Sequence, residues 1–185
     1  MKKLMMMSLA ATAVMGAAFA TQMGNNDVMV GGEAMFPMKN IVQNAVNSKD
    51  HTTLVAAVKA AGLVDTLASK GPFTVFAPVN TAFTLLPAGT VDTLLMPENK
   101  DTLTHILTYH VVAGKYDSKA LKNLITKGGG KASLKTVEGH NLWFMMNGPS
   151  NIVVKSESGT IANIPTYDVY QSNGVIHVID RILTF

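Results

Sequence analysis

The chain has 185 residues, of which 48% are hydrophobic and 15% are charged, as expected of one globular domain and not of a disordered chain. It has no cysteine, which excludes disulfides, cysteine-bound metals, a thiol nucleophile and a lipid-modified cysteine. Two of its 15 basic residues lie in the first twenty positions, so the remaining 13 nearly balance the 12 acids and leave no basic stripe for nucleic acid.

Residues 1–20 have the pattern of a bacterial secretory leader. Lys2 and Lys3 precede an uncharged run that ends in Ala-Phe-Ala, the small-x-small pattern that signal peptidase cuts. An uncleaved membrane anchor is the alternative, but the run is slightly short and rich in Ala and Thr. No later apolar run approaches transmembrane length. We therefore expect a secreted or periplasmic protein.

The next residues predict a linker and then helices. Residues 21–37 hold three Gly, two Asn and a Pro with no periodic apolar face, which is typical of a flexible linker before a domain at 38–185. Asn40 is a candidate cap for a helix over 40–47. Residues 52–61 repeat the helical spacing and end at Gly62, a typical C-terminal cap, and a short helix follows at 63–71.

The middle of the chain predicts one buried strand and three more helices. Residues 73–78 are β-branched and aromatic and end in a proline, as a strand would. Asn80 and Thr90 are candidate caps for two short helices, and Pro97 starts a longer one that runs to about Thr108. Residues 109–112 look like a strand.

From Ser133 onward, strand patterns and turn residues predominate. Two strands flank Glu138-Gly139, two more follow a turn at 147–151, and the last strand begins at Asn173-Gly174. Helices in the first half and strands in the second predict an α+β fold, with several short helices on one side of a sheet system.

The segment LWFMM, residues 142–146, is apolar at every position. At strand period, Trp143 and Met145 face one way while Leu142, Phe144 and Met146 face the other. A strand buried on both faces explains this pattern without any function. An exposed adhesive surface is the alternative.

Catalytic and metal-binding motifs are missing from the sequence. Its five histidines lack the spacing of a helical metal site, and no nucleophile elbow, phosphate loop or dinucleotide fingerprint occurs. We expect neither an enzyme nor a metal or cofactor.

His177 and Asp180 lie in the apolar run VIHVIDRIL, where a neutral histidine hydrogen-bonded across the core explains the pattern better than a catalytic one.

Three stretches in this order together resemble the fasciclin domain family: GPFTVFAPVNTAF at 71–83, LTYHVVAG at 107–114 and NGVIHVIDRIL at 173–183. The resemblance covers about residues 38–184. It implies a wedge or sandwich of twisted strands flanked by several helices. It also implies an exported, non-enzymatic adhesion module.

The resemblance also suggests sites. Tyr109 and His110 match the family's Tyr-His box, which is implicated in receptor recognition in animal members, and Asp168 and Val169 occupy the place of an Asp-Ile pair. His177 and Asp180 belong to the last box and look structural. Asn80 would likewise have a structural role, as the cap of the helix that follows Pro78.

Two functional hypotheses follow. The first is an adhesion domain, expected to be a monomer, that binds a cell-surface or matrix protein or glycan. The second is a periplasmic carrier of a small, lipid-like apolar ligand. Seven methionines follow the leader, the LWFMM strand is apolar on both faces, and flexible Met side chains suit adaptable pockets. A hydrolase assembled from scattered residues is a third alternative.

The leader makes the first testable prediction. Cleavage after Ala20 is expected because the charged start, apolar run and small-residue end agree. Sequencing the N-terminus of exported protein should give Thr21 first. Intact residues 1–20 in a membrane fraction would instead establish the anchor.

Overall fold

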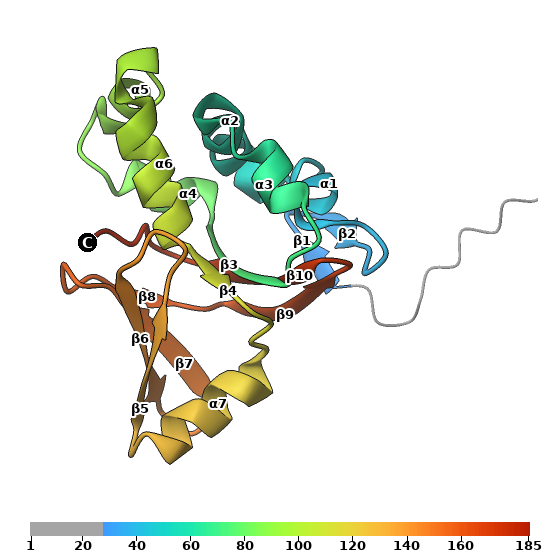
Figure 1. Cartoon of the computed structure of the whole chain (residues 1–185), viewed down its shortest axis with the longest axis vertical. Helices are drawn as coiled ribbons and strands as arrows, with labels where there is room; N and C mark the ends of the chain where they lie inside the picture. Colours follow the sequence, from blue (N-terminus) through green and yellow to red (C-terminus); the bar gives the residue numbers. More distant parts are fainter. Residues whose placement is uncertain (1–27) are drawn as a thin grey trace, which may run out of the picture.

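The computed structural model describes residues 28–185, and a layer of helices covers one face of its central sheet (Figure 1). The helices of this layer are short because glycines, prolines and caps interrupt them. They are α1 (Ile41–Ala45), α2 (Thr52–Ala61), α3 (Val64–Ala68), α4 (Asn80–Thr84), α5 (Thr90–Leu94) and α6 (Lys100–Tyr109), with single 3-10 turns at Lys49–His51 and Pro97–Asn99.

The central sheet has the order β4-β3-β10-β9. Its strands are β3 (Phe73–Pro78), β4 (Val111–Ala113), β9 (Thr166–Gln171) and β10 (Gly174–Ile179). Strand β10 runs parallel to β3 and antiparallel to β9, and all six of its residues are buried. A strand covered on both faces needs apolar side chains on both, which is why the apolar run of β10 is interrupted only by His177.

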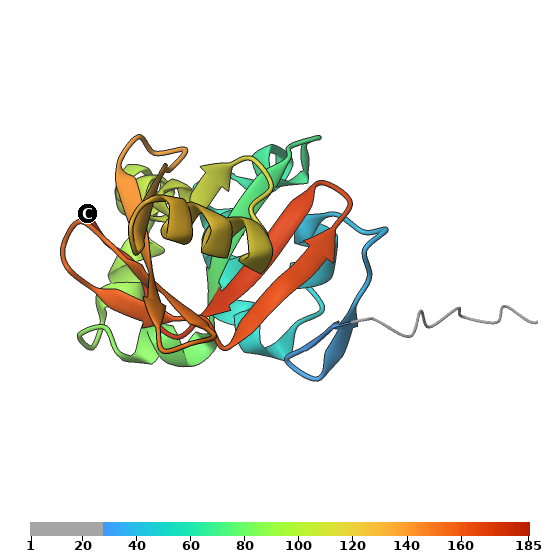
Figure 2. The same ribbon diagram turned by 90° about the horizontal axis from the view of Figure 1, so that it is seen from below.

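A second sheet and one helix form the far layer. The sheet has the order β5-β6-β7-β8, and all its pairs are antiparallel. Figure 2 shows α7 lying across the open side of the wedge that the two sheets make. These elements are α7 (Ser118–Lys127), β5 (Lys131–Lys135), β6 (Asn141–Asn147), β7 (Asn151–Lys155) and β8 (Ile161–Asn163).

The two faces of the central sheet belong to two separate hydrophobic cores. On the helical face, Ile176 and Val178 of β10 pack with α2 and α6. On the other face, Phe76 and Ile179 pack with α7 and the inner face of the second sheet. Alternation along β3 and β10 sends successive side chains into opposite cores, so both layers depend on this strand pair.

Asn173 ties the start of β10 to the helical layer. Its side-chain oxygen accepts from the Ile41 N–H at 3.0 Å, and its amide donates to the carbonyls of Leu67 and Ser69 at 2.8 and 2.7 Å. The next residue must be glycine, because a Cβ at Gly174 would lie 2.1 Å from the Phe73 carbonyl oxygen.

The α+β prediction is confirmed, as are several local signals. Asn40 caps α1 through a reciprocal capping box with Gln43, and Gly62 ends α2 in the left-handed conformation. The strand at 73–78 and the helices at 52–61 and 100–109 lie where the patterns put them.

Three elements differ from the sequence analysis. Helix α7 and strand β9 were not predicted, although Asp117 caps α7 and Leu121 and Ile125 form its buried stripe. Residues 109–112 are also not one strand. Tyr109 ends α6 and His110 caps it, because a single residue separates α6 from β4.

The predicted linker is wrong over its second half. Strands β1 (Val28–Val30) and β2 (Glu33–Met35) form a hairpin whose Val30 and Met35 are buried in the helical core. Gly31 makes the close approach possible, since a Cβ there would lie 2.6 Å from the Ser48 hydroxyl. Each of its strands has only three residues, too few for alternating apolar and polar residues to reveal a strand. Residues 1–27, including the predicted leader, lie outside the described part.

The buried Asn173 amide gives the second prediction. Asn173→Ala should lower the free energy of unfolding by about 3 kcal/mol, because three backbone groups, two of them buried, lose their partner. The exposed Asn151→Ala is the matched control and should change stability by less than about 0.5 kcal/mol. Urea unfolding measures both, and equal midpoints for the two variants would contradict this role.

Candidate functional site

Tyr109 is a buried link between the layers. Its side chain is fully buried, its hydroxyl donates to the Asn141 carbonyl at 2.9 Å, and the same oxygen accepts from the Glu157 N–H at 2.9 Å. Burial raises the pKa of this phenol. With both hydrogen bonds inside the protein, Tyr109 has no group left on the surface for a partner.

His110 is also enclosed. Its Nδ1 donates to the Ile106 carbonyl at 2.8 Å, and its Nε2 accepts from the Leu183 N–H at 3.0 Å, an arrangement that requires a neutral ring. Burial lowers the pKa of His110 to about 4. The ring therefore connects the end of α6 to the C-terminal segment.

Asp168 and Val169 lie on β9 and point to different surroundings. Val169 is buried in the helical core. Asp168 lies at a β-bulge opposite His177 with a φ of 58°, and its carboxylate accepts from the N–H of Ser118 at 2.6 Å and from the Ser118 hydroxyl. Asp168 thus binds the first turn of α7, where negative charge is favoured.

His177 and Asp180 each satisfy backbone groups. The His177 ring is fully buried, stacks on Phe76, and donates from Nε2 to the Tyr116 carbonyl at 2.8 Å. Burial lowers its pKa. Asp180 accepts from the backbone N–H of Asn163 at 2.8 Å and from its side-chain amide at 2.7 Å.

The cap assignments in the middle of the chain need correction. Asn80 is the first residue of α4 and accepts from the Thr53 N–H at 3.0 Å, while its amide donates to the Lys49 carbonyl at 2.8 Å. It therefore caps α2, which lies next to it in space, and not its own helix. Thr90 is likewise inside α5, which begins after Gly89.

A cluster that the sequence analysis missed lies where the β5–β6 turn meets α6. The Glu138 carboxylate binds Nδ1 of His140 and lies 3.3 Å from Nδ1 of His105. The hydrogen bond from His140 lowers the pKa of Glu138, and the same hydrogen bond raises the pKa of His140. Within residues 28–185 no group of three such side chains is arranged to hold a metal.

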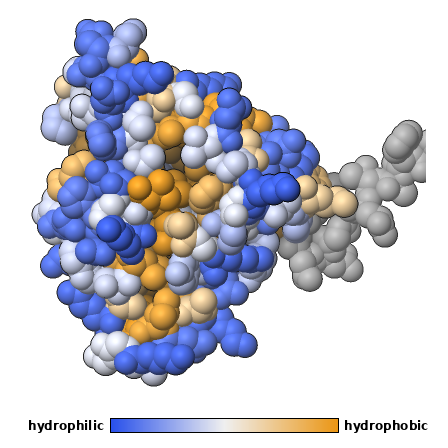
Figure 3. All heavy atoms as spheres, in the orientation of Figure 1, coloured by the Kyte–Doolittle hydropathy of each residue, from blue (hydrophilic) through white to orange (hydrophobic). Residues whose placement is uncertain are grey.

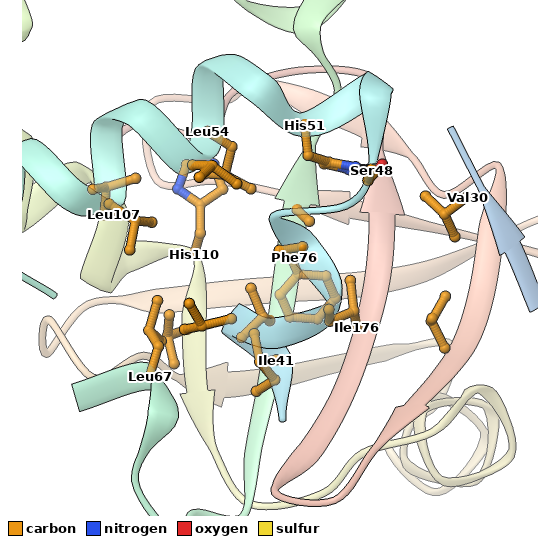
Figure 4. Close-up of a pocket in the computed structure, with 18 of the residues that line it drawn as sticks. Val30, Ile41, Ser48, His51, Leu54, Leu67, Phe76, Leu107, His110 and Ile176 are labelled. Carbon is orange, nitrogen blue, oxygen red and sulfur yellow. Dashed lines mark hydrogen bonds between the residues drawn. The ribbon is translucent and has the colours of Figure 1, made fainter. Parts of the chain in front are cut away.

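An apolar cavity of about 60 Å³ lies between α2 and the central sheet (Figure 4). Aliphatic side chains such as Leu54, Leu107 and Ile176 line it. Its polar lining residues include His51 and His110. Nδ1 of His51 is 2.8 Å from the Ser48 hydroxyl, and its Nε2 has no hydrogen-bond partner. Burial lowers the pKa of His51, although the nearby Ala77 carbonyl opposes this effect.

The second sheet presents an outer face that differs from its inner one. Leu142 and Phe144 are buried in the core below it, whereas Trp143 and Met145 point outward and are half-buried. The prediction that β6 is buried on both faces is therefore wrong for this side. The outer face consists of Lys131, Ser133, Lys135, Asn141, Trp143, Met145, Asn147, Asn151, Val153, Lys155, Ile161 and Asn163.

Elsewhere the surface is mixed. In the view of Figure 3, hydrophobic atoms show as a narrow band between broad hydrophilic areas. Several exposed large apolar side chains, among them Met38, Leu85 and Met96, lie outside β5–β8, and Ile161 lies within β8. Single exposed apolar residues are ordinary on protein surfaces and need no function.

Comparison with known proteins agrees with the topology. The profile of the fasciclin domain matches residues 49–185. The chain belongs to the fasciclin domain family. A solved FAS1 domain pair from the insect cell adhesion molecule Fasciclin I has the same fold, with a TM-score of 0.72 at 20% identity over 86% of this chain and 58% of that one.

Relatives of this fasciclin domain occur in bacteria and animals. Protein sll1483 of Synechocystis is 49% identical over 143 residues, which cover 77% of this chain and 72% of the relative. The transforming growth factor-beta-induced protein ig-h3 of Sus scrofa is 33% identical over 150 residues, 80% of this chain but 19% of that protein.

The buried histidines give a prediction about pH. An unfolded histidine gains its proton near pH 6.5, whereas folded His110 stays neutral to about 4, so the unfolded state binds more protons between these values. Stability should therefore fall as pH falls through this window, by on the order of 3 kcal/mol from His110 at its lower end. His51 and His177 act in the same direction.

Urea unfolding at several pH values, with an NMR titration of the ring protons, measures this effect. The His110 resonances should remain those of a neutral ring at pH 5.5. Stability that is constant from pH 7 to 5, or a His110 ring that titrates near 6.5, would contradict the burial argument.

Proposed function

We propose that this fasciclin domain is an exported, non-enzymatic interaction module that attaches to a cell-surface or matrix partner through the outer face of the β5–β8 sheet. The observation that carries the proposal is the outward-facing Trp143, the single tryptophan of the chain, in the middle of that face. Tryptophan is among the residues most enriched at the energetic centres of interfaces.

The proposal moves the contact surface away from the Tyr-His box. Tyr109 and Val169 are at most 1% exposed and His110 is 3% exposed, so a partner cannot reach these side chains without unfolding the region. Asp168 is half-buried with both carboxylate oxygens bound to Ser118. Family membership thus supports the class of function, while burial favours a different surface.

Export is part of the proposal and rests on the leader at residues 1–20. A relative named cell surface glycolipoprotein MPB83, from Mycobacterium bovis, is 30% identical over 172 residues, 90% of this chain and 69% of its own length. Its name is consistent with a location outside the cytoplasm. Among the described residues, no helix has the length and apolar character needed to cross a bilayer.

The carrier hypothesis has one observation in its favour, the apolar cavity beneath α2. Its volume of about 60 Å³ holds only a few carbon atoms, whereas ligand pockets typically measure about 300 Å³ or more. Of the methionines that prompted the hypothesis, Met35 lines the cavity, but Met145 and Met146 of the LWFMM strand do not. A lipid-sized ligand would require the helical layer to move, so attachment is the better supported function.

Attachment of beads coated with the domain tests the proposal. Trp143→Thr with Met145→Thr should leave the urea midpoint nearly unchanged, because threonine suits a strand, and should reduce attachment to cells or matrix about tenfold. The control is Met38→Thr with Met96→Thr, which removes exposed apolar area elsewhere and should attach normally.

Tyr109→Phe and Asp168→Asn provide the opposite comparison. Tyr109→Phe removes two internal hydrogen bonds, and Asp168→Asn removes the charge from the contacts with Ser118. The free energy of unfolding should therefore fall by about 1 to 3 kcal/mol, and attachment only in proportion to the unfolded fraction. The proposal would be contradicted if the Tyr109 and Asp168 variants were stable but failed to attach while the Trp143 variant attached normally. The binding site would then lie at the Tyr-His box.

A further inference from the structure

The pairing register places three lysines around Trp143. Lys155 on β7 is its direct partner on one side, and Ser133 on β5 is its partner on the other. Lys131 and Lys135 stand two residues before and after Ser133, so both are diagonal neighbours of Trp143, about 7 to 8 Å away between their backbones. An aromatic ring thus lies at the centre of a triangle of positive charges.

The geometry of one lysine is already defined. The Lys131 ammonium lies 5.2 Å from the centre of the Trp143 ring, within cation–π range. Lys131 and Lys135 are exposed and Lys155 is half-buried, so all three can reach a ligand lying over the indole. Lysine side chains of this kind adjust to a ligand because their stems are long and flexible.

Acidic side chains lie outside the strands of this sheet. Strands β5 to β8 contain no Asp or Glu at any of their residues. Carboxylates contact its margins. Glu157 accepts from the Asn141 N–H, Glu138 binds His140, and Asp180 accepts from Asn163 at the end of β8. The lysines around Trp143 are therefore not neutralised by acidic side chains in their own strands.

We propose that the outer face of the β5–β8 sheet binds an anionic polysaccharide, a sugar chain that bears carboxylates. A pyranose ring presents an apolar face of C–H groups, which an aromatic side chain can cover, while the lysines pair with the acid groups. The exposed amides of Asn147 and Asn151 border the face and can bond sugar hydroxyls. This inference rests on the proposed attachment function and names the partner's chemistry.

The observations favour a polysaccharide over an anionic membrane. Membrane-surface proteins insert protruding aromatic and aliphatic side chains into the headgroup region. Trp143 is instead half-buried within a sheet surface, with Lys131 and Lys135 beside it on β5 and Lys155 on β7. A recessed ring bordered by cations and amides suits a chain that lies along the sheet.

The single tryptophan makes the test direct, since all indole fluorescence reports on Trp143. The mature domain is titrated at low salt with alginate, a carboxylated polysaccharide, and in parallel with neutral dextran, dextran sulfate and anionic phospholipid vesicles. Alginate should give a saturable fluorescence change that weakens with added salt, and dextran should give none. A stronger response to vesicles or to dextran sulfate than to alginate would overturn the assignment.

Charge reversal supplies matched variants. Lys131→Glu with Lys155→Glu should weaken alginate binding about tenfold or more, whereas Lys70→Glu with Lys119→Glu changes the net charge equally at exposed sites elsewhere and should keep binding within about twofold. Equal weakening in both pairs would mean unspecific attraction and would overturn the site. If bead attachment needs Trp143 but alginate does not bind, the attachment function stands and this inference fails.

Discussion

The parallel pairing of β10 with β3 is the constraint on which the rest of the structure depends. Every residue of β10 is buried, so each polar group in or beside this strand must find its partner inside the protein. His177 does so through the Tyr116 carbonyl, and Asn173 through three backbone groups of the helical layer. The polar residues of the last box therefore position layers and leave little for catalysis or binding.

The same reasoning separates the family signature from the surface that we propose for binding. Tyr109 and His110 join α6 to the second sheet and to the C-terminal segment through hydrogen bonds that use all their polar atoms. A signature of this kind preserves the wedge and so can accompany many partners. The outer face of the β5–β8 sheet lies away from both cores, and its side chains can vary without disturbing the fold.

Local signals made part of this structure predictable. Caps at Asn40 and Gly62 depend on neighbouring residues and were recognised, whereas Asn80 caps a helix that is adjacent only in space. The face of Trp143 could not be assigned either, because alternation separates the two sides of a strand but does not say which side a second layer covers. The β1–β2 hairpin is stabilised by contacts with the helical core, and these contacts could not be predicted from its short strands.

Hydroxyl-radical footprinting of the domain attached to its target surface tests the central claim most directly. The account predicts slower oxidation of Trp143 and Met145 on attachment, with unchanged oxidation of Met38 and Met96, which are exposed elsewhere and act as internal references. Protection of Met38 or Met96, with Trp143 and Met145 oxidised at the rate of the free domain, would show that attachment uses another face and would contradict the account.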